Sequence, residues 1–140
     1  MADAFYDNFR NTMLGGGVHG QLNLDTADVR VILRDEGADA LNLADQDLAD
    51  ITAGARIAVS AAVGNPTVGT AATGAYDHDN VTFTAVTGAS VESLDYYQHT
   101  GTESTSQLIM NIDSATGLPV TPNGGNITWT PAAGGVAQIT

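Results

Sequence analysis

Apolar and polar residues alternate most clearly in the last third of the chain, within residues 105–130. Leu108, Met110 and Ile112 lie two positions apart and therefore share one face of a candidate strand, because strand side chains point alternately to opposite faces. Residues 127–129 repeat this alternation. The connection between the two segments is rich in glycine and proline, which favour turns. The pattern predicts a β-hairpin with a long, rigid connection.

A second strand is predicted in the segment VRVILR, which begins at Val29. Val31 and Leu33 share the face of Val29, whereas Arg30 and Arg34 share the opposite face. Two of the chain's four arginines are thus expected on one side of a single strand. We expect their partners to be carboxylates of the same chain or of a neighbouring subunit.

Further strands are predicted by alternation or by β-branched and aromatic residues, over residues 56–62, 67–75, 81–86, 91–98 and 136–139. In the first of these, Ile57, Val59 and Ala61 are expected to point inward. Residues 45–50 predict one helical turn within an acidic loop. With about eight short strands separated by turn signals, the chain is expected to be mainly β, as a single-domain β-sandwich or barrel-like fold, with a jelly roll possible.

The N-terminal residues 2–14 break this pattern and predict a short amphipathic helix. Phe5, Phe9 and Met13 follow a four-residue spacing, and Tyr6 widens the apolar stripe. The stripe is expected to dock on the protein's own β core or, alternatively, on a neighbouring subunit or partner.

Three consecutive glycines end the predicted helix. The expected organisation is therefore one domain over residues 1–140, with an N-terminal arm (1–14), a glycine hinge (15–20) and a β domain (21–140).

The charges are one-sided: the chain has 16 acidic residues, 4 arginines and no lysine, for a net charge of −12. Binding to nucleic acid or to an anionic membrane needs clustered Lys and Arg, so neither partner is expected. The acidic residues are expected to solvate the surface or to meet a basic partner. Without cysteine the chain forms no disulfide. Its N-terminus has no secretory-signal pattern, and residues 57–63, the longest apolar run, are too short for a membrane span.

Few residues suggest chemistry. The Asp77-His78-Asp79 cluster could in principle bind a cation, but a polar turn is the better interpretation because an EF-hand spacing is absent. Asp45 and Asp47 could in principle act as an acid/base pair, but a solvated acidic loop is the simpler interpretation. No nucleophile elbow or phosphate loop is present. We therefore expect no catalytic, cofactor-binding or metal-binding residues and a protein that is not an enzyme.

The aromatic residues and paired arginines are better candidates for a core or an interface, because aromatic side chains can bury an apolar body and keep a polar group satisfied. The candidate interface residues are Phe5, Tyr6, Phe9, Met13, Arg30, Arg34, Tyr96, Tyr97 and Trp129.

Three segments resemble a group of small structural proteins encoded by tailed bacteriophages: DNVTFTAVTG (79–88), YYQHTGTESTS (96–106) and IDSATGLPVTPNGG (112–125). The short helix, the strand from Val29 and the segment LADITAGAR (48–56) are also similar. The chain departs from the group in the more polar segment VESLD (91–95) and in Gln98-His99, which replace the usual lysine after the tyrosine.

This resemblance implies a virion protein, and among virion roles we favour a cement or decoration protein on the capsid exterior. Such a protein would bind the major capsid protein and stabilise the shell, as a homo-oligomer and preferably a trimer. The alternatives are a tail, head-fibre or baseplate component, or a module that binds host glycans through Tyr96, Tyr97 and Trp129.

Overall fold

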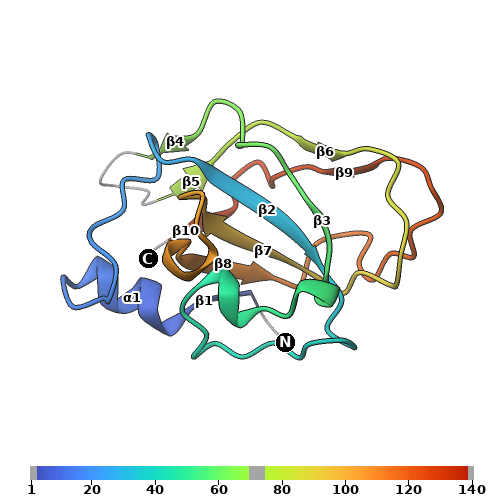
Figure 1. Cartoon of the computed structure of the whole chain (residues 1–140). Coiled ribbons are helices and arrows are strands. Elements are labelled where there is room, and N and C mark those ends of the chain that lie inside the picture. The colour runs from blue at the N-terminus through green and yellow to red at the C-terminus, as the bar shows by residue number, and fades with distance from the viewer. Residues whose placement is uncertain (1–2, 70–74, 139–140) are drawn as a thin grey trace.

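The structure, a computed structural model, describes residues 3–69 and 75–138. Its centre is a five-stranded antiparallel sheet with the strand order β1-β8-β7-β2-β3 (Figure 1). In that order the strands span Ala4–Phe5, Leu108–Ile112, Ser93–Gln98, Val29–Arg34 and Arg56–Val59. The described residues form a mainly β fold with one α-helix, α1 (Asp7–Met13), near the N-terminus, which confirms the predicted fold class.

Two smaller sheets pack against one face of the central sheet. Near α1, a three-stranded sheet has the order β10-β5-β4, and toward the opposite end β6 pairs with β9 (Figure 1). These strands are β4 (Thr67–Val68), β5 (Ala75–Asp77), β6 (Val81–Phe83), β9 (Ile127–Trp129) and β10 (Ala137–Gln138). The strands predicted over 67–75, 81–86 and 136–139 are thus shorter than expected, and residues 70–74 and 139 lie outside the described part.

The main hydrophobic core lies between the central sheet and these smaller sheets. Val29, Val31 and Leu33 of β2 contribute to it and do not reach solvent, which confirms the predicted alternation of this strand. Tyr76 of β5 and Phe83 of β6 close on them from the smaller sheets. The removal of these side chains from water is the principal free-energy gain of the fold.

A second hydrophobic cluster covers the opposite face of the central sheet. Ile32 of β2 packs there against Leu48 and Ile51. Leu48 and Ile51 belong to the acidic segment that follows β2. This segment directs its apolar residues toward the sheet. The predicted helical turn is present as η1 (Leu48–Asp50), and two further short helices are η2 (Ala53–Ala55) and η3 (Glu103–Thr105). The central strands are therefore buried on both faces.

The predicted hairpin over residues 105–130 is wrong, because β8 and β9 belong to different sheets. β8 pairs with β7 on one side and with β1 on the other, whereas β9 pairs with β6. The long connection does not fold back on β8. Instead Val120 forms a bridge with Val91, and the chain then crosses to the second layer. A short N-terminal strand occupies the edge of β8 that the hairpin would have used.

The predicted face of β8 needs a correction at one residue. Met110 and Ile112 lie in the main core, but Leu108 packs in the second cluster on the opposite face. The pairing of β7 with β8 shifts register between Tyr96 and Tyr97. An extra residue at such a bulge reverses the direction of the side chains beyond it, so strict alternation fails there.

The inward residues predicted for 56–62 are also partly wrong. Ile57 packs on the main core as expected, but Val59 is 46% exposed and Ala61 is exposed. Ala58 packs on the core instead. The pairing of β2 with β3 is irregular between Leu33 and Arg34, which changes the order of inward and outward positions.

The N-terminal helix begins later than predicted, at Asp7, because Ala4–Phe5 form strand β1 at the edge of β8. Tyr6 connects the two elements with an extended backbone. The arm docks on its own domain: Phe9 is 3% exposed in the main core, and Tyr6 is fully buried in the second cluster. Of the two predicted docking modes, the structure thus shows the intramolecular one.

Candidate functional site

A cluster of fully buried polar side chains lies on the second face of the central sheet. Arg34 and Asp95 form an ion pair with 3.2 Å between Nη1 and Oδ2, and neither side chain reaches solvent. The Tyr6 hydroxyl donates to Asp95 Oδ1 at 2.7 Å, and the Asn111 amide donates to the same oxygen at 2.8 Å. The cluster therefore connects the N-terminal arm with β2, β7 and β8.

Arg34 also holds the segment that follows β2 on this face. Its Nε and Nη2 donate to the Asp39 carbonyl at 3.1 and 3.0 Å, and Nη2 donates to the Ala40 carbonyl at 3.1 Å. Its Nη1 donates to the Tyr6 hydroxyl at 3.2 Å. Such complete hydrogen bonding is what makes a buried guanidinium tolerable.

The electrostatics of this cluster suit a structural role. Burial raises the pKa of Asp95, and the Arg34 guanidinium leads the interactions that oppose this rise. Burial also raises the pKa of the Tyr6 phenol, and the Asp95 charge raises it further, so Tyr6 remains a hydrogen-bond donor. All three side chains are fully buried and therefore cannot touch a substrate in this conformation.

A second polar chain links the smaller sheets to the central sheet through His78. Its Nδ1 lies 2.6 Å from the Asp79 carbonyl, which can only accept, so Nδ1 carries the proton. In the neutral ring its Nε2, 2.8 Å from the Tyr96 hydroxyl, then accepts from that hydroxyl. Trp129 Nε1 donates to the same hydroxyl at 2.5 Å. Burial lowers the pKa of His78, so the neutral ring is the form that this arrangement binds.

The carboxylates weighed for metal or acid/base chemistry have local partners. Asp77 accepts the His78 backbone N–H at 2.8 Å. Asp45 accepts the Asn42 amide at 2.7 Å, and burial raises its pKa. Asp47 pairs with His19. Residues 3–69 and 75–138 contain no group of three or more His, Asp or Glu side chains arranged to hold a metal ion.

All four arginines, which are the only Lys or Arg residues of the chain, are paired internally. Besides Arg34, the pairs are Arg10–Asp7, Arg30–Asp28 and Arg56–Glu103. The hydrogen bond from Arg30 holds the pKa of Asp28 below its usual value. The partners predicted for Arg30 and Arg34 are therefore carboxylates of the same chain. The surface is left with an excess of carboxylates.

The predicted interface residues are mostly interior. Tyr6, Phe9, Arg34, Tyr96 and Tyr97 are buried within the single chain. Phe5, Arg30 and Trp129 are partly buried, and Met13 is 42% exposed. Their participation in an interface stays a prediction, and Met13 is the member that presents most surface.

Sequence reasoning missed two strongly exposed apolar residues next to Met13. Leu14 is 87% exposed and Val18 is 67% exposed. We name Met13, Leu14 and Val18 the apolar ridge. The signal that could have found it is the position of Leu14, which lies off the predicted helix stripe and directly precedes the glycines. Large apolar residues exposed at nearby positions of the chain are candidates for a contact surface.

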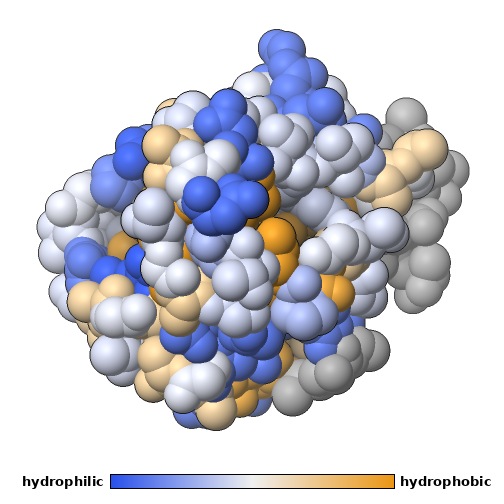
Figure 2. All heavy atoms as spheres, turned by 90° about the vertical axis from the view of Figure 1, so that its right-hand side faces the viewer, coloured by the Kyte–Doolittle hydropathy of each residue, from blue (hydrophilic) through white to orange (hydrophobic). Residues whose placement is uncertain are grey.

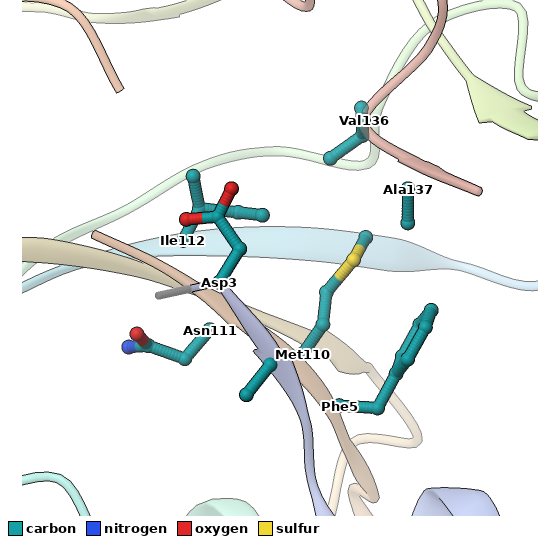
Figure 3. Close-up of a pocket in the computed structure, with 8 residues that line it drawn as sticks. Asp3, Phe5, Met110, Asn111, Ile112, Val136 and Ala137 are labelled. Atoms are coloured by element: carbon teal, nitrogen blue, oxygen red, sulfur yellow. The ribbon is translucent and has the colours of Figure 1, made fainter. Parts of the chain in front are cut away.

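A small pocket of about 200 Å³ lies where the N- and C-terminal parts of the chain meet (Figure 3). Figure 3 shows that Phe5, Met110 and Val136 point into it, whereas Asn111 points to the other side of the sheet. Asp3, at its rim, accepts hydrogen bonds from Ser114 through its backbone N–H at 3.0 Å and its hydroxyl at 2.7 Å. The surface of the pocket is thus mainly apolar, and the Asp3 carboxylate at its rim is already occupied by Ser114.

No protein-family model matches the chain, and no curated protein matches it. In the part of the chain that the structure describes, no helix has the length and apolar character needed to cross a membrane.

Proposed function

We propose that this chain is a structural protein of a tailed-bacteriophage virion, which binds the major capsid protein on the capsid exterior and stabilises the shell. The observation that carries the proposal is the apolar ridge, exposed on a domain whose buried cluster of Tyr6, Arg34 and Asp95 is committed to its own fold. The resemblance of three segments to phage structural proteins supports the same role.

The apolar ridge is held in a defined position, as a docking surface requires. Thr12 of α1 is buried and accepts a hydrogen bond from Gln107 at 2.8 Å. The Val18 backbone N–H donates to Asn8 at 3.1 Å, so the glycine hinge folds back on α1. A β-carbon at Gly17 would lie 2.8 Å from the Thr12 Cα, which explains the glycine there. A preorganised ridge loses little conformational entropy on binding.

The mechanism is mechanical. A protein that contacts two neighbouring shell subunits buries new surface only while those subunits remain in place. Its binding free energy therefore stabilises the assembled shell by linkage. In this proposal the copies gather as trimers at threefold positions, as the resemblance implies, and the acidic surface faces basic groups of the shell.

Copy number per virion tests the proposal. Purified particles are analysed by quantitative mass spectrometry, and the chain is normalised to the major capsid protein. Near parity with the shell subunit is expected for a cement protein. A count of a few to a few tens per particle would favour the tail, fibre or baseplate alternative, and absence from particles would overturn a virion role. The glycan-binding alternative has less support, because Tyr96 and Tyr97 are buried.

A further inference from the structure

A second cleft lies at the end of the central sheet that is farthest from α1. It has a volume of about 230 Å³ and lies between the end of the sheet and the chain from Ala115 to Trp129. Leu33 and Leu94 form its base, and Leu118 and Ile127 line it from the connection and from β9. Figure 2 faces this end of the molecule and shows apolar atoms at its centre among polar ones. Leu33 and Leu94 are buried, whereas Leu118 and Ile127 are partly exposed and offer apolar surface to an incoming side chain.

Three polar side chains that line this cleft, Trp129, Asn126 and Thr128, already have partners within the chain. Trp129 donates its indole N–H to Tyr96 at 2.5 Å. Asn126 accepts the Ala85 backbone N–H at 3.1 Å, and the Thr128 hydroxyl lies 3.1 Å from that of Thr82. A ligand in the cleft would therefore gain by burial of apolar surface and not by hydrogen bonds to these groups. This chemistry suits an apolar side chain.

The same end of the sheet is acidic because of its topology. β2 ends where β7 begins and where β8 ends, since neighbouring strands are antiparallel. The carboxylates of this end are Asp35, Glu36, Glu92 and Asp113. Glu92 accepts the Glu36 backbone N–H at 3.0 Å, which brings the two acidic residues together.

The two arginines of this end do not neutralise the cleft. Arg34 turns to the opposite face of the sheet, where Asp95 binds it. Arg56, opposite Arg34 in the pairing of β2 with β3, donates to the Ile51 carbonyl and pairs with Glu103. The end of the sheet that carries the apolar cleft therefore keeps an excess of carboxylates over arginines.

We propose that this cleft receives an apolar side chain from a partner segment that carries Lys or Arg beside it. A second copy of the chain fits poorly, because its net charge is −12 and its arginines are already paired. The inference deepens the proposed function, on which it rests for the identity of the partner as a shell subunit. α1 and β9 lie toward opposite ends of the domain (Figure 1). The apolar ridge, at the end of α1, and the cleft, lined by β9, therefore provide two separate contact surfaces, as a bridge between two subunits requires.

Trp129 is the only tryptophan of the chain and lines the cleft, so its fluorescence reports occupancy. The purified protein is titrated with two capped tetrapeptides, lysine-leucine-phenylalanine-lysine and its glutamate analogue, in which both lysines are replaced. The basic peptide is expected to change the emission and to bind at least about tenfold more tightly than the acidic one, with an affinity that falls as salt is added.

Variants locate the binding. Thr116 is exposed and lines the cleft, so Thr116→Phe should fill the cleft and abolish the response without replacing a core residue. The double change Glu36→Gln and Glu92→Gln should weaken binding of the basic peptide. Asp25→Asn, at an exposed residue beyond the other end of β2, should leave that binding unchanged. No response to either peptide, equal affinity for both, or an unchanged response of folded Thr116→Phe would overturn the inference.

A shell-binding assay separates this inference from the proposed function. If the wild type binds shells of the major capsid protein and Thr116→Phe binds equally well, the cleft assignment fails and the virion role stands. If the wild type is absent from virions and does not bind shells, the proposed function fails, and the peptide titration still decides the chemistry of the cleft.

Discussion

Arg34 and Asp95, 61 positions apart in the sequence, form an ion pair with 3.2 Å between Nη1 and Oδ2, and both side chains are fully buried. A buried pair of this kind adds little net stability relative to apolar residues, but loss of one partner leaves an uncompensated charge in the interior. The pair joins β2 to β7, and its carboxylate accepts a hydrogen bond from Tyr6 of the N-terminal arm. The arrangement of these three elements therefore depends on the pair.

Arg34→Met should lower the free energy of unfolding by about 3–5 kcal/mol, because it leaves the Asp95 carboxylate buried without its cation. Arg30→Met is the matched control on the same strand, since its pair with Asp28 is partly exposed and should contribute less than about 1 kcal/mol. Urea denaturation followed by circular dichroism measures both. Equal losses for the two variants would contradict a special role of the buried pair.

Tyr6→Phe should cost about 1.5–3 kcal/mol, because the lost hydroxyl donates to a buried carboxylate at 2.7 Å. Tyr76→Phe is a matched control: Tyr76 is also buried, but its hydroxyl has no hydrogen-bond partner in the described part of the chain. That change should not lower stability, because it removes a buried hydroxyl that has no partner to lose. If the control lost as much stability as Tyr6→Phe, the phenol–carboxylate bond would not be the cause.

Stability should fall as the pH decreases below about 6.5 because of His78. Burial lowers the pKa of this ring, so the fold binds its neutral form. Its contribution to the free energy of unfolding is complete above the unfolded-state pKa and is lost as the pH falls toward the lower folded-state pKa. Protonated Nε2 could no longer accept from Tyr96.

Denaturant unfolding between about pH 7.5 and 5 should therefore show a smaller pH dependence for His78→Gln than for the wild type. Asp28 and Asp39 have lowered pKa values, so their contributions are lost only below their ordinary value of 3.8 and do not overlap this window. Other carboxylates are common to both proteins. A His78→Gln curve parallel to that of the wild type would exclude this histidine as the source.

Leu14→Ser should leave the free energy of unfolding within about 0.5 kcal/mol, because the side chain is 87% exposed, but it should weaken attachment to capsids. Val59→Ser, at an exposed apolar residue of β3 outside the ridge, is the control. Co-sedimentation with undecorated shells measures attachment. Deletion of residues 1–14 is less informative, since it also removes the buried Tyr6 and Phe9.

The candidate surfaces were only partly predictable. The sequence pattern favours the aromatic residues as interface candidates, yet Tyr96 and Tyr97 are interior. The exposed Leu14 directly follows the amphipathic helix and is not part of its predicted apolar stripe. Hydrophobicity alone cannot separate core from contact surface, because both bury apolar side chains in their final state. The carboxylates at the cleft end of the sheet come from strand ends that meet only in the folded sheet.

The sequence by itself determined the local elements of this protein: the alternation from Val29 to Arg34, the turn at Leu48–Asp50 and the mainly β character. Strand alternation and turns depend on neighbouring residues, so they can be predicted from the sequence. Only the tertiary structure decided which strands pair, that β8 and β9 separate, and that Arg34 meets Asp95. Those outcomes depend on which distant strands compete for each free strand edge, and on the two bulges in the central sheet. The free energies of both arise only when the whole sheet assembles.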